Sequence, residues 1–268
     1  MVAGLRAAGL GRMDEILIPP YMCGAVLSAL YRTCFPSMTP SGRTKAVFVY
    51  HQFGFPQKLS GIEKLAQEKG WVILNDCANT VFTRVGGKLL VEWGDFSIIS
   101  LAKLYPCGLG GGFYSQQPNL RKIVCAEHQR VAGRQAERAD QALEKLININ
   151  NGLFKDETVF EIHGLYGYLP ELAAFPQKAC SALPSTEKEI KKDIARRKNI
   201  WSLVKGMLPA RVPICDEGDE VVPFAIPVSG DPSDLEKMSN KIKKKLSLDA
   251  PVLHFDFSRN MLKPDYRK

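Results

Sequence analysis

Two patterns of apolar and polar positions alternate along the first part of the chain. The continuous apolar runs EILIPP, KAVFVYHQFG, WVILNDCAN, GDFSIIS and GGGFYS are typical of buried strands. Between two of them, LSGIEKLAQEKG places Ile62, Leu65 and Ala66 on one helical face, and Gly70 supplies the C-terminal stop. A further helix is expected over Cys23–Arg32. This alternation predicts an α/β fold with a mostly parallel sheet covered by helices.

Glycines mark two turns in this part of the chain. A hairpin is expected around Gly86 and Gly87. The glycine-rich stretch 108–112 is interpreted as a tight turn before the next strand. A dinucleotide-binding loop is disfavoured because it requires a strand, a glycine loop, a helix and a downstream acidic residue in that order.

The second half of the chain is predicted to be mainly helical. Helices are expected over Asn119–Ile149 and Glu187–Leu208, and VVPFAIPV reads as an edge strand because it contains prolines. A last helix, capped by Ser233 or Asp234, is expected to follow. With a boundary near 177–185, residues 1–180 are predicted to form a large domain and 181–268 a small C-terminal α+β lobe.

Composition excludes several classes of protein. The 268 residues are 45% hydrophobic and 24% charged, as in globular proteins. No run approaches the ~18 apolar residues of a membrane span, and residues 1–11 lack a signal-peptide core. Seven scattered cysteines without a CxxC pair favour reduced thiols. We therefore expect a cytoplasmic protein that does not bind membranes.

The formal net charge of +8 leaves two kinds of anionic partner to consider. The basic residues concentrate in Lys188–Lys198 and Lys241–Lys245, without interleaved aromatic residues on which bases would stack. These runs are interpreted as solvated helix faces. Nucleic-acid binding is therefore not expected, whereas small anionic substrates remain compatible with the charge.

Polar residues fall at the ends of the predicted strands. His51, Asp76 and Ser100 each lie at such an end, where parallel sheets usually bind ligands. As a lone histidine, His51 is interpreted as a structural hydrogen-bonding residue rather than a site residue. Lys103 is the only lysine between Lys88 and Lys122, and it follows a strand and precedes the glycine-rich turn.

The ordered run from FVYHQFGFP through NDCANTVF to SIISLAKLYPCGLGGGF resembles the DegT/DnrJ/EryC1/StrS aminotransferases, fold-type I enzymes that use pyridoxal phosphate. The similarity extends from Asp14 to about Ser115, with a weaker match in VPFAIPV and APVLHFD. The chain is most similar to a branch that has a Ser-Leu-x-Lys segment before its glycine turn. In the commoner branch the lysine stands farther along, at a spacing that falls on Tyr105.

The resemblance implies a role for each matching residue. Lys103 would form the Schiff base with pyridoxal phosphate and carry a proton during amino transfer. Asp76 would face the pyridine nitrogen and keep it protonated. Ser100 matches a phosphate ligand, and Asn79 replaces the Gln or His that lies near the ring oxygen. The loop against the ring face corresponds to Tyr21, Met22 and Cys23, for which ordinary core contacts are an equal alternative.

The resemblance also implies an activity and an assembly. The expected function is amino transfer from an amino acid, most simply glutamate, to a keto sugar or nucleotide-linked keto sugar, by a homodimer. Relatives begin with a further phosphate-binding helix start and continue beyond VLHFDFS, so this chain is expected to be trimmed at both ends. The alternative is a catalytically inactive member that keeps the fold as a binding or scaffold module.

Overall fold

The computed structural model describes residues 1–107, 110–130, 141, 181–207, 220–227 and 231–247. Within these residues a six-stranded sheet has the order β2-β1-β3-β4-β7-β8, and a two-stranded ribbon pairs β5 with β6. All neighbours in the large sheet are parallel except β7 and β8. Its strands are β1 (Glu15–Leu17), β2 (Phe35–Ser37), β3 (Thr44–Tyr50), β4 (Val72–Asp76), β7 (Phe96–Ser100) and β8 (Gly111–Tyr114).

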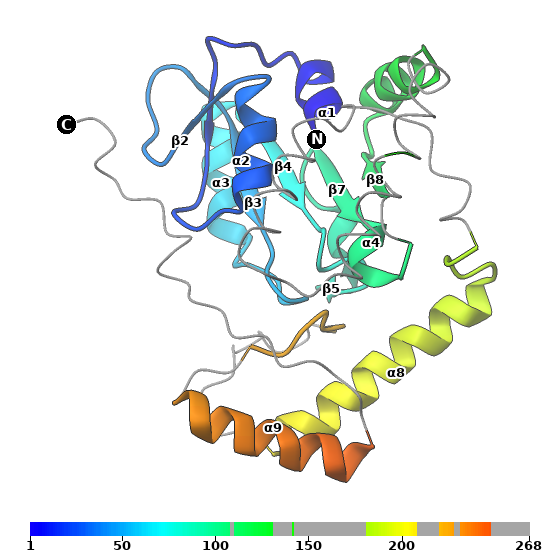
Figure 1. Ribbon diagram of the computed structural model, residues 1–268. Helices are drawn as coiled ribbons and strands as arrows, with labels where there is room; N and C mark the ends of the chain where they lie inside the picture. The colour runs from blue at the N-terminus through cyan, green and yellow to red at the C-terminus, as the bar shows by residue number, and fades with distance from the viewer. Residues whose placement is uncertain (108–109, 131–140, 142–180, 208–219, 228–230, 248–268) are drawn as a thin grey trace.

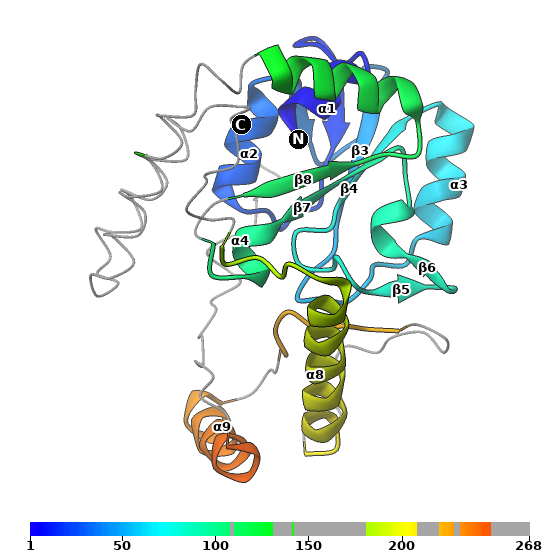
Figure 2. The same cartoon turned by 90° about the vertical axis from the view of Figure 1, so that its right-hand side faces the viewer.

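Helices cover both faces of the sheet (Figures 1 and 2). On one face lie α1 (Val2–Ala7) and α2 (Gly24–Tyr31), and on the other lie α3 (Ser60–Lys69) and the short 3-10 helix η1 (Leu90–Glu92). The predicted mostly parallel, helix-covered sheet is therefore confirmed.

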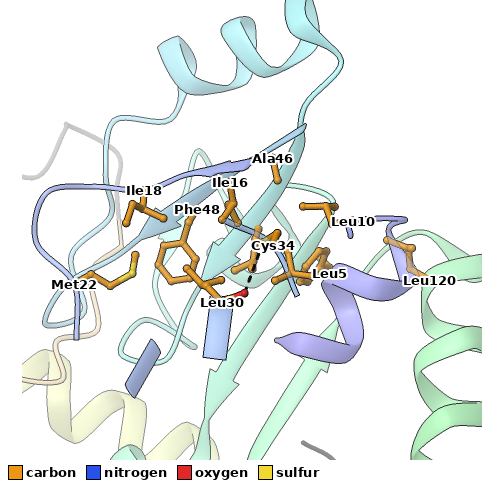
Figure 3. Close-up of a cluster of buried hydrophobic side chains, with 12 residues drawn as sticks. Leu5, Leu10, Ile16, Ile18, Met22, Leu30, Cys34, Ala46, Phe48 and Leu120 are labelled. Atoms are coloured by element: carbon orange, nitrogen blue, oxygen red, sulfur yellow. Dashed lines mark hydrogen bonds between the residues drawn. The ribbon is translucent and has the colours of Figure 1, made fainter. Parts of the chain in front are cut away.

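Alternation along the strands builds a separate core on each face. In β3, Ala46 and Phe48 point toward α1 and α2, whereas Val47 and Val49 point toward α3. Figure 3 shows the first of these cores, in which β1, β3, α1, α2 and the 118–130 helix all contribute side chains. Every strand therefore has two distinct faces, and the face of a residue decides which neighbours it meets.

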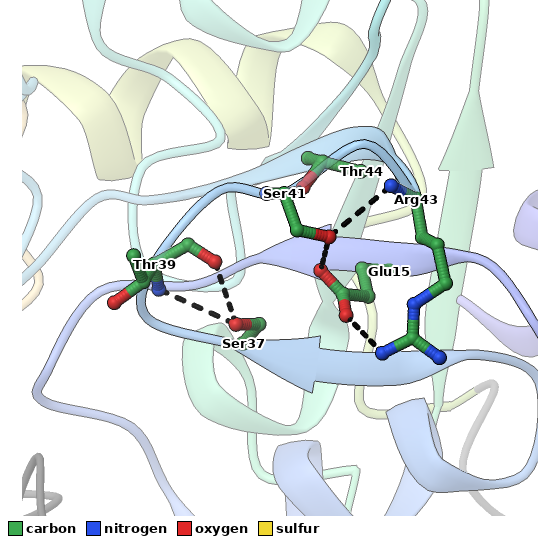
Figure 4. Close-up of polar contacts among 6 residues, drawn as sticks. All are labelled: Glu15, Ser37, Thr39, Ser41, Arg43 and Thr44. Atoms are coloured by element: carbon green, nitrogen blue, oxygen red, sulfur yellow. Dashed lines mark hydrogen bonds and ion pairs between the residues drawn. The ribbon is translucent and has the colours of Figure 1, made fainter.

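A buried carboxylate fixes the start of two neighbouring strands. The Glu15 side chain is only 2% exposed, and it accepts hydrogen bonds from the Ser41 hydroxyl and the Arg43 guanidinium, both at 2.6 Å (Figure 4). A buried charge of this kind is tolerated only when it is paired. Because Glu15 pairs in register with Thr44, this network aligns β1 with β3.

The predicted turns agree with the structure. Gly86 and Gly87 both have positive φ (55° and 83°), as a two-residue hairpin turn requires, and they join β5 (Arg84–Val85) to β6 (Lys88–Leu89). Gly70 ends α3 in the left-handed conformation, with φ 65°. The strand expected after the glycine-rich turn is β8, although residues 108–109 of that turn lie outside the described residues.

Three short elements were not predicted from the pattern. They are β2, which pairs with β1 at the edge of the sheet, the 3-10 helix η1, and α4 (Leu101–Leu104), a single helical turn directly after β7. The helix expected over Asn119–Ile149 is present at 118–130, and most of the remainder lies outside the described residues.

Two expectations for the C-terminal part were wrong. VVPFAIPV forms no strand over its described residues 221–227, where only the preceding residue Glu220 makes an isolated bridge, to Arg84. Pro223 and Pro227 cannot donate to a strand ladder. The cap of α9 (Pro232–Leu246) is Asp231, which accepts from the backbone N–H of Ser233, rather than Ser233 or Asp234.

The C-terminal elements lie beyond the carboxyl ends of the parallel strands (Figures 1 and 2). The long helix α8 (Glu187–Lys205) begins with a capping box between Thr186 and Glu189. Its Trp201 ring packs edge-on against the Phe55 ring, with 5.3 Å between the ring centroids. No helix among the described residues is long and apolar enough to cross a membrane.

Gly54 lets a C-terminal segment approach the large sheet closely. It has φ +99°, and a Cβ placed on it would lie 2.5 Å from the Cα of Pro223. The Thr83 hydroxyl donates to the Gly54 carbonyl (2.7 Å) and accepts from the N–H of Val222 (3.1 Å). The N–H of Phe224 donates to the Phe53 carbonyl at 2.8 Å. The segment is therefore held by backbone contacts that leave no room for a side chain at position 54.

Candidate functional site

Three predicted strands, β3, β4 and β7, end side by side at the carboxyl edge of the sheet, and a polar side chain near each end lies on the same face. Tyr50 is paired in register with Asp76, and Asp76 with Ile98, two residues before Ser100. Alternation places Tyr50, Asp76 and Ser100 on the face covered by α1 and α2, because Phe48, Leu74 and Ile98 belong to that core. The carboxyl edge of this face therefore gathers polar groups from three strands.

Asp76 is a buried carboxylate at the centre of this edge. It is 3% exposed, and its Oδ1 accepts a hydrogen bond from the backbone N–H of Ala78 at 2.9 Å. Burial raises the pKa of Asp76, while the Ala78 hydrogen bond and the positive charge of Lys103 oppose that rise. The net rise means that the charged carboxylate is under-compensated, so a further cation beside it would be favourable.

Lys103 lies in the one-turn helix α4, between β7 and β8. The turn is closed by a hydrogen bond from the N–H of Tyr105 to the Leu101 carbonyl (2.9 Å), and the Leu101 N–H donates to Gly110 (3.0 Å). Ser100 is the N-cap residue, but its side chain makes no capping hydrogen bond. The exposed Lys103 side chain thus begins at the same sheet edge as Asp76. Its positive charge is close enough to lower the pKa of Asp76.

Tyr50 joins the remaining members of the candidate site. Its hydroxyl accepts a hydrogen bond from the Asn79 side-chain amide at 3.3 Å. Burial raises the pKa of Tyr50, and the nearby Asp76, Tyr21 and Cys23 raise it further. These electrostatic neighbours show that the loop before α2 reaches the ends of β3 and β4. Tyr50 is therefore a protonated phenol, and it lies between Asn79 and Asp76 on one side and the loop with Tyr21 and Cys23 on the other.

The carbonyl oxygen of the Asn79 side chain is buried and has no hydrogen-bond partner in the structure. Buried polar atoms are rarely left unpaired, and functional sites are one of the places where they occur. Since Asn79 lies three residues after Asp76 and donates to the Tyr50 hydroxyl, this atom adds an unused hydrogen-bonding position to the same edge.

Met22 differs from its two loop neighbours. It is 4% exposed and belongs to the core on the α1 and α2 face, together with Ile18 and Phe48 (Figure 3). Tyr21 is half-buried, and Cys23 is exposed at the N-cap of α2. The core alternative therefore holds for Met22.

His51 points away from the candidate site. Its side chain is fully buried on the α3 face, where Nδ1 accepts from the N–H of Gln57 (3.0 Å) and Nε2 lies 2.5 Å from Oδ1 of Asn75. Asn75 in turn donates to the Leu90 carbonyl and the Ser97 hydroxyl. Burial lowers the pKa of His51 to about 4, so the ring is neutral. The structural interpretation of His51 is confirmed.

The edge combines an exposed primary amine with a buried carboxylate, a phenol, an amide and a hydroxyl. This set suits a ligand that carries a carbonyl able to react with the amine and a cationic ring nitrogen able to face the carboxylate. Among the described residues, no group of histidine, cysteine or acidic side chains is arranged to hold a metal ion.

Comparison with protein families gives a match to the model described as the DegT/DnrJ/EryC1/StrS aminotransferase family. The match covers residues 39–174, 136 of the 268 residues in the chain. The chain belongs to this family. The matched range includes Tyr50, Asp76 and Lys103.

Two curated members of the DegT/DnrJ/EryC1/StrS family are similar over part of their length. The chain is 30% identical over 143 residues to a UDP-N-acetyl-3-dehydro-alpha-D-glucosamine 3-aminotransferase of Acidithiobacillus ferrooxidans, covering 46% of this chain and 39% of the relative. It is 28% identical over 131 residues to a dTDP-4-dehydro-2,3,6-trideoxy-D-glucose 4-aminotransferase of Saccharopolyspora spinosa, covering 41% of this chain and 34% of the relative. The matches thus span well under half of each relative.

The fold agrees with solved structures. The aminotransferase TlmJ from Streptoalloteichus hindustanus superposes with a TM-score of 0.59 at 18% identity, over 91% of this chain and 66% of that one. At this identity the likeness concerns the fold alone.

Proposed function

We propose that this protein is an aminotransferase that uses pyridoxal phosphate, moving an amino group from an amino acid to a keto sugar or nucleotide-linked keto sugar. The observation that carries the proposal is that Asp76 and the lysine-bearing turn α4 lie at one sheet edge, where the positive charge of Lys103 lowers the pKa of Asp76 against the effect of burial. Family membership supports amino transfer, and the sugar-nucleotide names of the curated relatives support the acceptor class.

The residues present fit the cofactor. A buried carboxylate with a raised pKa, such as Asp76, is stabilised by a protonated ring nitrogen. The amide oxygen of Asn79 has no hydrogen-bond partner, and the Ser100 hydroxyl makes no capping hydrogen bond to α4. Both groups leave polar positions open on the same edge. When bound, pyridoxal phosphate supplies an electron-withdrawing ring through which an amino group is accepted and then given up.

Each side chain of the candidate site would have its own role in binding the cofactor or moving a proton. The Lys103 amine would hold the cofactor covalently and, once released by an incoming amine, move a proton at its Nζ. Asp76 would keep the ring nitrogen protonated, and Ser100 would contact the phosphate. Asn79, held by the Tyr50 hydroxyl, would lie beside the ring oxygen. From the α2 loop, Tyr21 and Cys23 would lie against the ring, with Met22 supporting them from the core.

Several further parts of the proposal concern the whole protein. Glutamate is the proposed amino donor, and a homodimer in the cytoplasm is the proposed assembly. We also propose a large domain over 1–180 and a small lobe over 181–268. Size measurement by light scattering tests the dimer, because a monomeric mass in the presence of the cofactor would contradict it.

A half-reaction tests the proposed activity. Protein mixed with pyridoxal phosphate should show an absorbance band distinct from that of the free cofactor. Added glutamate should convert this band and release 2-oxoglutarate in equal amount, and a nucleotide-linked keto sugar should then restore the band. Binding of the cofactor with no conversion by any amino acid would contradict the transferase activity and favour the inactive binding module.

Matched variants assign the reaction to the site. Lys103→Ala should abolish the band, whereas Lys122→Ala, which removes an exposed lysine from the neighbouring helix, should leave it intact. Asp76→Asn keeps the shape of the side chain but removes its charge, so cofactor binding should weaken and conversion should slow. Equal behaviour of the Lys103 and Lys122 variants would contradict the assignment.

A further inference from the structure

The lysine-bearing turn α4 is held from outside by α8, a helix far away in the sequence. The Arg197 guanidinium donates to the carbonyl oxygen of Leu104, the last residue of α4, at 3.1 Å across 93 residues of chain. Leu104 is the neighbour of Lys103. A helix of four residues satisfies few of its own carbonyls, so an external donor at its end is a substantial share of what fixes it.

Arg197 is itself held in place. Its Nε donates to Oδ2 of Asp193 at 2.8 Å, and the two side chains are only 15% and 17% exposed. Burial pushes the pKa of Asp193 upward, but hydrogen bonds from Arg197 and Arg196 outweigh it, and the net shift is downward. Asp193 therefore stays charged and keeps one edge of the guanidinium anchored while another N–H reaches α4.

Apolar contacts surround the same junction. Cys107, which is buried, forms a small cluster with Leu101, Ala102 and Tyr105 from the lysine segment and with Ala182 and Leu183 from the approach to α8. Burial raises the pKa of Tyr105, and so does the charge of Asp193. Residues 101–107 therefore pack against the chain that leads into α8.

From this geometry we infer that Arg197 is a positioning residue for Lys103: anchored by Asp193, it clamps the end of α4 and thereby fixes the direction from which the lysine amine meets its ligand. The inference rests on the proposed function, since it gives the lysine a cofactor to meet. It also links the α8 segment to the chemistry at the sheet edge, although no residue of α8 is assigned there.

The test compares two adjacent arginines. Arg197→Met removes the contact with Leu104, and Arg196→Met is the matched control, because Arg196 also donates to Asp193 (2.9 Å) but is 61% exposed. In cofactor-free protein, hydrogen exchange of the Tyr105 amide should accelerate on the order of tenfold in Arg197→Met, as expected for loss of a hydrogen bond from a charged donor. Exchange in Arg196→Met and in the β4 strand should not change.

A spectroscopic signature separates positioning from a purely structural tie. With pyridoxal phosphate bound, the pH midpoint of the cofactor band should shift in Arg197→Met, stay unchanged in Arg196→Met, and return toward the wild-type value in Arg197→Lys. If Arg197→Met folds poorly, Asp193→Asn should give a smaller shift in the same direction. If Arg197→Met leaves hydrogen exchange of the Tyr105 amide unchanged, the inference is overturned. Faster exchange of that amide with an unchanged pH midpoint of the cofactor band would also overturn it. Absence of any band in wild type would instead refute the proposed function.

Discussion

The buried His51 makes the stability of the protein depend on pH in a defined direction. Its pKa falls from the ordinary 6.5 to about 4 in the folded state, because burial disfavours the charged ring. A group whose pKa is lower in the folded state stabilises the protein fully above its unfolded pKa and loses that contribution as the pH falls toward its folded pKa. The sensitive window is therefore pH 6.5 down to 4.

The size of the effect follows from this difference in pKa. Since one pKa unit corresponds to about 1.4 kcal/mol, protonation of His51 should cost roughly 3 kcal/mol of unfolding free energy across the whole window, of which about 2 kcal/mol is lost by pH 5. One hydrogen bond adds to the effect of burial: Nδ1 accepts from the Gln57 N–H, which a protonated ring cannot do.

Urea denaturation between pH 7 and 4 tests this reasoning. His51→Gln retains an amide that can donate and accept but cannot titrate, so its unfolding free energy should decline less steeply than that of wild type between pH 6.5 and 5. His128→Gln, which changes a partly exposed histidine, should follow wild type. Parallel curves for wild type and His51→Gln would refute the assignment of this pH dependence to His51.

Two further substitutions test packing. Gly54→Ala should destabilise the protein by roughly 1–3 kcal/mol and make residues 220–225 more accessible to protease, because the new Cβ meets Pro223 and φ is positive, whereas Gly42→Ala, with open space around it, should stay within about 0.5 kcal/mol. Leu74→Ala should cost about 2–5 kcal/mol in urea denaturation because Leu74 is fully buried, while Leu65→Ala, 39% exposed, should cost much less; equal costs would contradict the assigned core.

Periodicity predicted the central strands because each buries side chains on both faces. It was least informative where a single position decides the face. His51 and Tyr50 both lie at the end of the same strand, yet only Tyr50 is in phase with Phe48 and meets Asp76. Ala46, Phe48 and Tyr50 alternate onto one face of β3. Following this alternation to the end of the strand would have selected Tyr50 for the candidate site.

Contacts between distant segments explain the features that the sequence did not reveal. The β2 strand depends on its pairing with β1, and the clamp between Arg197 and Leu104 joins residues that no local pattern connects. The expected strand in VVPFAIPV did not form because its prolines lack donors, and the segment instead donates hydrogen bonds to the Phe53 carbonyl and the Thr83 hydroxyl. Lys103 and Asp76, in contrast, were predicted through ordered motifs rather than through any contact.

The central claim is that Lys103 is the residue that binds pyridoxal phosphate. Borohydride reduction of the protein mixed with the cofactor, followed by peptide mapping, tests it most directly. The reduced cofactor should be found on the peptide that contains Lys103, at one equivalent per chain, and should be displaced by an amino donor added before reduction. Label spread evenly over exposed lysines such as Lys88 and Lys122, or absent altogether, would contradict the claim.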